Sequence, residues 1–209
     1  MIREDARGLI EIWRKRNITG VFCENKSQVN GKILELIPKG ASVGFSGSRT
    51  LEELEIIKAL ELRGNKIFNQ YAPGLSREES MGARRAGTQA DYYLASANAI
   101  SQKGELVFFS AYGHRIAGIA DGRKVIVVCG LNKIASNLEE AIKRARNYVT
   151  PLNCKRLNWP SFCRKDGICD SGACLAPEYK RMCCQILVLE AEVDSGRLSV
   201  ILSGEDLGF

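Results

Sequence analysis

The sequence lacks the features of a secreted, membrane-spanning or repetitive protein. Its N-terminus, MIREDARGLIEIWRKRN, is charged throughout and has no apolar stretch, so we expect no secretory signal. No run approaches the roughly 18 apolar residues of a membrane-spanning helix, and no internal period indicates a repeat array. We therefore expect a cytoplasmic protein with no membrane span, in which thiols stay reduced and disulfides are disfavoured.

Catalytic signatures are also scarce. His114 is the one histidine in 209 residues, and no recognisable nucleophile accompanies it. The chain shows no serine protease-like triad, no HExxH and no paired-carboxylate signature. Whether the protein is an enzyme stays open, and a component of an oxidoreductase is the enzymatic role that we consider.

What is present is the composition of an ordinary globular domain. Hydrophobic residues make up 45% and charged residues 26% of the chain, which is enough for a sizeable core. The net charge of +6 is mild, and the basic residues are interleaved with acids or lie on amphipathic stretches. We interpret them as solvated helix faces with some attraction for anionic metabolites, and we predict no nucleic-acid partner.

Short apolar segments alternate with amphipathic ones along most of the chain. The predicted strands are 19–23, 41–48, 65–69, 91–98, 104–110 and 124–130, and the predicted helices are 2–16, 26–37, 50–64, 76–90 and 137–149. In the clearest helix, Thr50 and Glu53 are expected to form a capping box and Gly64 to end the helix. Runs such as VIVVCG are continuously apolar, as in strands covered on both faces. The alternation predicts an α/β fold with a mainly parallel, buried sheet.

The pattern changes after Pro151. Residues 150–184 carry proline, glycine and cysteine without periodicity, and so long a segment needs something to order it. The stretches QILVLEAEV and GRLSVILSG follow, with a turn at 194–196, and predict a hairpin that closes one sheet edge. We thus predict a single domain over 1–209, with a helical N-terminal region at 1–40 and a cysteine-rich, metal-binding insertion at 150–184.

The stretch GFSGSRT connects a predicted strand to a predicted helix. Its glycines would let backbone N–H groups approach a ligand closely, and a helix N-terminus attracts anions. The stretch matches neither the dinucleotide fingerprint nor the Walker motif. Either it binds a phosphate or carboxylate, or it is only a tight, well-capped turn. The candidate ligand-binding residues here are Gly44, Ser46, Gly47, Ser48 and Thr50.

Further polar residues follow other predicted strands. Asn98 ends one strand, and Asn132 and Lys133 directly follow another. Because open α/β sheets bind ligands at the carboxyl ends of their strands, all three are candidate ligand-binding residues; the alternative for Asn98 is an Asx turn. Arg115 is a candidate clamp for an anion, whereas we expect a structural or surface role for His114.

Five of the eight cysteines fall within residues 162–184. Structural zinc usually shows two close cysteine pairs, whereas iron–sulfur clusters tolerate the irregular spacing found here. An iron–sulfur cluster is therefore the favoured cofactor and zinc the alternative, while disulfide, redox-active or inert cysteines stay open. We expect Cys184 to pack in the strand that follows. The candidate metal ligands are Cys163, Cys169, Cys174 and Cys183.

Several stretches together resemble the LUD-domain family, which is linked to lactate utilisation. They are GFSGSRTLEEL, ASANAISQKGELV, KVIVVCGLNKIASNLEEAIKRAR with TPLNCKRL, the RMC at Cys183 and the ending SGEDLGF. The resemblance implies a Rossmann-like three-layer sandwich, similar to CoA transferases and sugar-phosphate isomerases. It also implies a site built from the turn at 44–50, Asn98 and residues 113–115. Members commonly show Asp and Gly-Asn-Arg where this chain has Ser110 and Gly-His-Arg.

The family's link to L-lactate oxidation alongside iron–sulfur proteins implies a function. The leading hypothesis is a redox-linked metabolic protein that binds a small anionic metabolite, carries an iron–sulfur cluster and meets iron–sulfur partner proteins. One alternative is an acyl- or CoA-transferase-like enzyme with a structural zinc, for which Glu205 is the nearest candidate glutamate. Another is a non-catalytic subunit of a redox complex. A homo-oligomer is compatible with the sequence.

Overall fold

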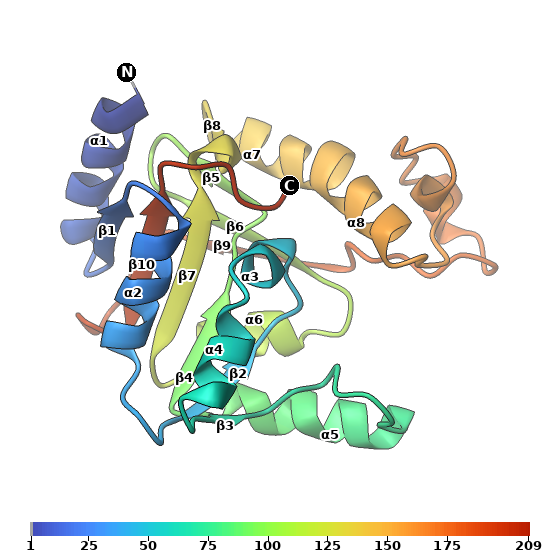
Figure 1. Cartoon of the computed structure of the whole chain (residues 1–209). Helices are drawn as coiled ribbons and strands as arrows, with labels where there is room; N and C mark the ends of the chain where they lie inside the picture. Colours follow the sequence, from blue (N-terminus) through green and yellow to red (C-terminus); the bar gives the residue numbers. More distant parts are fainter. Residues whose placement is uncertain (1) are drawn as a thin grey trace.

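A six-stranded parallel sheet forms the centre of the molecule (Figure 1). The computed structural model describes residues 2–209, with side chains from Ala6 onward. Every neighbouring pair of strands in this main sheet is parallel, so the strands end at one common edge. In spatial order the strands are β1 (Thr19–Cys23), β10 (Leu198–Ser203), β7 (Val125–Gly130), β4 (Tyr92–Ala95), β2 (Ser42–Phe45) and β3 (Lys66–Ile67).

The central strands are covered on both faces, as their continuously apolar sequences predict. All residues of β7 are buried, and Val127 lies between Ala95 of β4 and Val200 of β10. Because side chains alternate along a strand, Val127 joins one apolar core and Val128 the other. Both faces of β7 therefore need a covering layer.

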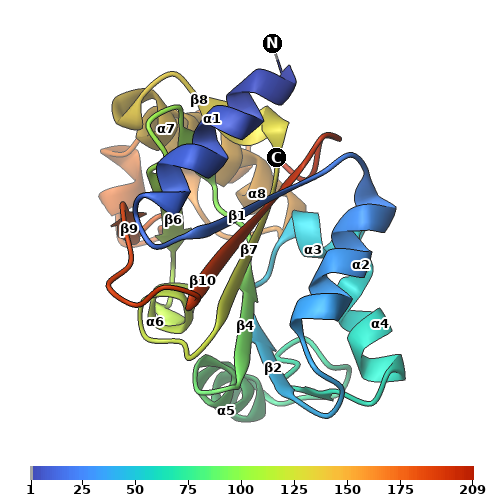
Figure 2. The same ribbon diagram turned by 90° about the vertical axis from the view of Figure 1, so that its left-hand side faces the viewer.

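Helices and a second sheet supply these layers (Figure 2). One face is covered by α2 (Lys26–Leu36), α3 (Arg49–Glu53) and α4 (Ile56–Leu62). The other is covered by α1 (Ile2–Arg14), α5 (Arg77–Thr88), α6 (His114–Ala120) and the second sheet. None of the helices in residues 2–209 combines the length and apolarity needed to cross a bilayer.

The second sheet corrects the prediction of a C-terminal hairpin. Its strands, in order, are β8 (Ile134–Ala135), β5 (Ala99–Ser101), β6 (Leu106–Ser110) and β9 (Gln185–Leu189). β9 pairs antiparallel with β6, whereas β10 enters the main sheet between β1 and β7. The hairpin prediction is wrong because β10 is buried on both faces and belongs inside the main sheet, while β9 leaves Ile186 40% exposed at the edge of the second sheet.

The helix predicted from Thr50 onward forms as two pieces. Glu55, with φ of 50°, separates α3 from α4, and Gly64, with φ of 90°, follows the end of α4 as predicted. The predicted capping box of Thr50 and Glu53 does not form. Ser48 is the N-cap of α3, because Thr50 and Glu53 instead make hydrogen bonds to the end of the chain.

The helix predicted at 137–149 continues beyond its expected end. α7 (Leu138–Arg144) passes through a π-helical turn (Ala145–Val149) into α8 (Thr150–Arg156). The wider turn accommodates Pro151, which has no N–H to donate. The irregular insertion predicted from residue 150 therefore starts only at residue 157.

Candidate ligand-binding site

A small polar cavity of about 40 Å³ lies at the carboxyl edge of the main sheet, where β2, β4 and β7 end. No carboxylate side chain from the described residues lines it. Many of the predicted ligand-binding residues meet here, although they are far apart in sequence. The lining residues are Gly47, Ser48, Arg49, Thr50, Ser96, Ala97, Asn98, Arg115, Lys133, Val149, Asn153 and Phe209.

Lys133 is the buried cation of this cavity, with only 4% of its surface exposed. Its Nζ donates to Thr50 Oγ1 and Ser96 Oγ, each at 2.8 Å, and to Ala97 O at 3.2 Å. Burial lowers the pKa of Lys133 to about 8. All three acceptors are neutral, so no carboxylate is hydrogen-bonded to the ammonium group, and the Glu53 carboxylate acts on it only at a distance.

Two guanidinium groups converge on Asn98. Arg115, in the first turn of α6, donates to Asn98 Oδ1 at 3.3 Å, to Phe109 O at 3.1 Å and to Gly47 O. Arg144 of α7 donates to the backbone oxygen of Asn98 at 3.1 Å. Burial lowers the pKa of both arginines, and within the described chain neither pairs with a side-chain carboxylate. Together with Lys133 they make this edge of the sheet electropositive.

The residues of the glycine turn divide into two groups. Gly44 and Ser46 lie beneath the cavity and do not line it: a Cβ on Gly44 would lie 1.9 Å from Gly87 O, so the glycine allows α5 to pack closely, and Ser46 is fully buried. Gly47 lies at the surface of the cavity, where a Cβ would lie 2.0 Å from Tyr71 Oη. The turn therefore presents its second half to a ligand.

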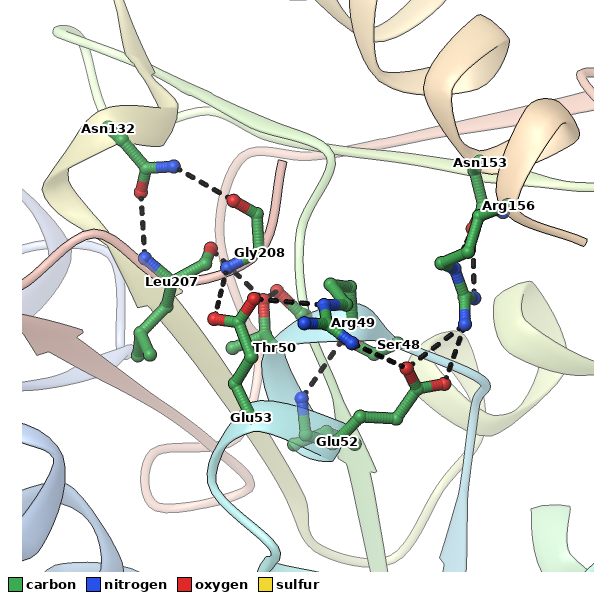
Figure 3. Close-up of polar contacts among 12 residues, drawn as sticks. Ser48, Arg49, Thr50, Glu52, Glu53, Asn132, Asn153, Arg156, Leu207 and Gly208 are labelled. Carbon is green, nitrogen blue, oxygen red and sulfur yellow. Dashed lines mark hydrogen bonds and ion pairs between the residues drawn. The ribbon is translucent and has the colours of Figure 1, made fainter.

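Asn132 holds the end of the chain instead of lining the cavity (Figure 3). Its side-chain amide accepts from Leu207 N and donates to Gly208 O, both at 3.3 Å. Thr50 Oγ1 donates to Leu207 O at 3.2 Å, and Gly208 N donates to Glu53 Oε2 at 3.0 Å. A Cβ on Gly208 would lie 2.6 Å from Thr50 Oγ1, so this position requires glycine.

A wider hollow, the vestibule, adjoins the cavity and shares Gly47, Arg115 and Asn153 with it. Its volume is about 290 Å³. His114 lies in its wall, and burial together with the charges of Arg84 and Arg115 lowers the pKa of His114 to about 4, so the ring is neutral at pH 7. The other lining residues are Tyr71, Arg84, Phe109, Ser110, Ala111, Tyr112, Arg156, Leu157, Trp159 and Met182.

Glu205 lies outside both hollows. Its exposed carboxylate accepts a hydrogen bond from Lys26 N at 2.9 Å, at the start of α2. This is the position of a helix cap and gives the residue no contact with the cavity. The geometry therefore does not favour the transferase hypothesis.

The cysteine segment, residues 157–184, follows α8 with only short 3₁₀ turns at Phe162–Arg164 and Ala173–Leu175. Its two ends are tied together by protein contacts. Lys180 N donates to Pro160 O at 2.7 Å, Trp159 Nε1 donates to Lys180 O, and the rings of Phe162 and Tyr179 meet edge to face at 5.7 Å.

Of the four predicted metal ligands, Cys169 lies within electrostatic range of the other three. Burial and the charges of Cys183, Cys163 and Cys174 raise the pKa of Cys169. Within residues 2–209, however, no group of three or more His, Cys, Asp or Glu side chains is arranged to hold a metal ion, and all eight cysteines are free. The prediction that Cys184 packs in a strand is wrong: it is exposed, and its Sγ donates to Arg181 O at 2.9 Å.

Sequence reasoning missed several residues of the site. Ser96 and Ala97 accept hydrogen bonds from Lys133. They directly precede Asn98 at the same strand end, and this position in the sequence could have identified them as candidate site residues. Arg144 and Asn153 come from the long helix that follows the main-sheet strands, and no local pattern marks them.

Comparison with known proteins identifies the family. The LUD-domain family model matches residues 6–202, so the chain belongs to the LUD-domain family. The crystal structure of a DUF162 family protein from Deinococcus radiodurans has a TM-score of 0.51 and 13% identity, covering 97% of this chain and 96% of that chain. The predicted family and three-layer α/β fold are thus confirmed, and at this identity the likeness concerns the fold alone.

Two further structures match in part. One is eIF2B beta from Chaetomium thermophilum, with a TM-score of 0.38 and 19% identity, covering 54% of this chain and 43% of that chain. The other is ribose 5-phosphate isomerase from Plasmodium falciparum, with a TM-score of 0.33 and 14% identity, covering 53% of this chain and 52% of that chain. No curated protein matches the sequence.

Proposed function

We propose that this LUD-domain protein binds a small organic anion at the carboxyl edge of its main sheet and acts in the metabolism of lactate or a related organic acid. The carrying observation is the convergence of Lys133, Arg115 and Arg144. The hydrogen-bond acceptors of Lys133 and Arg115 are neutral, and Arg144 donates to the backbone oxygens of Asn98, Asn132 and Phe209. Buried positive charges without partners are costly, and an anion in the cavity would offset that cost.

The cavity suits the head group of such a ligand. Its volume of about 40 Å³ leaves room for only a few atoms, such as those of a carboxylate or a phosphate. Without a ligand, Lys133 Nζ donates hydrogen bonds to the Thr50 and Ser96 hydroxyls and to the backbone carbonyl of Ala97. An anion that replaces one hydroxyl would exchange a neutral acceptor for a charged one, which makes a stronger hydrogen bond.

The test is binding of a panel of small carboxylates and phosphorylated metabolites, measured by titration calorimetry. Lys133→Met should weaken binding at least about tenfold, since a charge-assisted hydrogen bond is lost. Arg123→Gln is the matched control: it also removes one positive charge, but its side chain is 73% exposed and precedes β7 at the opposite end of that strand. Equal affinities for wild type and Lys133→Met would contradict the proposal.

We also propose that the cysteine segment holds an iron–sulfur cluster, with zinc as the alternative. Cys163, Cys169, Cys174 and Cys183 would be the ligands. The electrostatic interaction of Cys169 with the other three and the tied ends of the segment support this. A bound cluster would supply one-electron transfer. Because the thiols do not form a coordination shell as they stand, binding would have to draw the segment further together.

Analysis of iron, zinc and acid-labile sulfide in protein purified without air tests the cofactor. Iron and sulfide in near-equal amounts would support a redox-linked role for the protein. Stoichiometric zinc without sulfide would instead favour the structural-zinc alternative. Protein with neither metal would contradict both assignments.

A further inference from the structure

We propose that the anion bound in the cavity carries a planar aromatic or heteroaromatic ring, and that this ring lies in the vestibule against Tyr112 and Trp159. The inference rests on the proposed anion site and deepens it by naming the chemical class of the ligand. It follows from the relative size of the two hollows, from the rings at the vestibule surface and from the charges in its wall.

The two hollows are adjacent and unequal in volume. Gly47, Arg115 and Asn153 belong to the walls of both, and their volumes are about 40 and 290 Å³. An organic anion whose charged group lies beside Lys133 cannot fit the rest of its atoms there. They would extend into a neighbouring hollow, and both the vestibule and the hollow beyond Ser48 share lining residues with the cavity.

The vestibule presents aromatic surface to solvent. Tyr71 is 53% and Tyr112 48% exposed, and the ring of Trp159 meets that of Tyr112 nearly edge to face, with centroids 5.8 Å apart. Exposed aromatic rings gathered in one concave wall are typical of a ligand site, because stacking with a planar group removes apolar surface from water. The Arg84 guanidinium lies 4.9 Å from the centre of the Tyr112 ring and helps to fix its orientation.

The charges favour this hollow over its neighbour. The vestibule wall contains Arg84 and Arg115 and, within the described residues, no carboxylate side chain, while its Arg156 is paired with Glu52 at 2.8 Å. On the other side of the glycine turn lies a hollow of about 340 Å³, whose wall contains Lys58 but also the three glutamates Glu52, Glu55 and Glu61. An anionic ligand would be repelled by those carboxylates and attracted to the vestibule.

Two polar atoms of the vestibule residues also lack partners. His114 Nδ1 and Arg84 Nε are buried and make no hydrogen bond within the described chain. Buried polar atoms without partners are rare in folded proteins, and a further bound group is one explanation for them. Both atoms belong to residues of the same wall as Tyr112.

The experiment compares ligands that differ only by the ring. One pair is phenyllactate and lactate, and the other is adenosine 5′-monophosphate and ribose 5-phosphate. Titration calorimetry on the whole protein should show the ring-bearing member of one pair binding about tenfold more tightly than its partner, as stacking on aromatic side chains gives. The pair that shows this preference identifies the ring as that of an aromatic acid or of a nucleotide.

Variants locate the ring. Tyr112→Ala and Trp159→Ala should each reduce the preference for the ring-bearing ligand severalfold, with little effect on its ring-free partner. Tyr148→Ala is the matched control, because Tyr148 is 53% exposed and has the Arg144 guanidinium 5.1 Å from its ring centre, yet it lines neither hollow. Circular dichroism checks that each variant is folded. Trp159→Ala also removes the hydrogen bond from Trp159 to Lys180 O, so if that variant loosens the cysteine segment, Tyr112→Ala alone tests the location of the ring.

The outcomes separate this inference from the proposed function. If both members of each pair bind equally well, the proposal that the ligand carries a ring is contradicted, and the proposed anion site is not. A preference that survives both Tyr112→Ala and Trp159→Ala would overturn its location. Failure of every anion to bind would overturn the proposed function and this inference together.

Discussion

The ligand cavity and the cysteine segment adjoin, yet they are built in different ways. The cavity is formed by the ends of parallel strands and by buried side chains such as Lys133, whose hydrogen bonds are complete without a ligand. The cysteine segment has only short 3₁₀ turns between its tied ends, where Cys163 is buried and Cys169 and Cys174 are partly exposed. Trp159 and Met182, near its two ends, form part of the vestibule wall.

The difference indicates where each region obtains its order. Elements of the main sheet fix the cavity in advance, so a ligand should change its shape little. The cysteine segment contributes few buried side chains, and the exposed Ile168 and Leu175 show how little apolar surface it covers. A bound metal centre would supply the missing stabilisation.

The largest effect is expected from removal of a metal ligand. Cys163→Ser or Cys174→Ser should abolish metal binding and expose residues 157–184 to proteases, while the main sheet stays folded. Metal analysis and limited proteolysis with mass spectrometry measure both results. The matched control is Cys184→Ser, because Cys184 is exposed and donates to a backbone oxygen. Loss of the metal from Cys184→Ser alone would refute the assignment of the four ligands.

A bulky side chain in the glycine turn should act on the other region. Gly47→Val should weaken anion binding more than about tenfold, since its Cβ would lie 2.0 Å from Tyr71 Oη and would displace the turn that lines the cavity. Thermal stability should change little, because the atom it meets is the hydroxyl of the half-exposed Tyr71. Gly31→Val is the control, since a Cβ there has no neighbour within 4 Å. Unchanged anion affinity in Gly47→Val would exclude the turn from the site.

The pH dependence of binding should report on Lys133. Its pKa in the free protein is about 8, so the ammonium charge is lost as the pH rises through that value. The affinity for a carboxylate should be nearly constant from pH 6 to 7 and then fall, approaching tenfold per pH unit above pH 9. Calorimetry across this range measures it, and Lys133→Met should bind weakly with a flat profile. A wild-type affinity that stays constant to pH 9.5 would show that Lys133 is not the binding cation.

The smallest effect concerns stability in acid. The pKa of His114 is about 4 in the folded protein against 6.5 for the exposed group, so between these values the unfolded chain binds a proton that the folded chain resists. Stability should therefore fall as the pH drops from 6.5 to 4. Urea unfolding at pH 7 and pH 5 should show a smaller loss for His114→Gln than for wild type. Identical losses would mean that His114 titrates normally.

The local sequence determined most helices and strands but not which strands pair with each other. The strands around residues 125–130 and the helix α1 follow from apolar runs and amphipathic periods, which depend on near neighbours alone. Lys133 and Asn98 could be placed at one edge because parallel strands end together. The separation of β9 from β10 could not be predicted, since both read as apolar strands with a turn between them.

The sequence by itself determined the α/β class, the clustering of cysteines in one segment and the polar residues at the strand ends that line the cavity. Only the tertiary structure decided that Arg144 and Asn153 join that site, that Asn132 serves the end of the chain, and that Trp159 faces Tyr112. The physical reason is that backbone periodicity acts over a few residues, whereas these contacts depend on how separate layers pack.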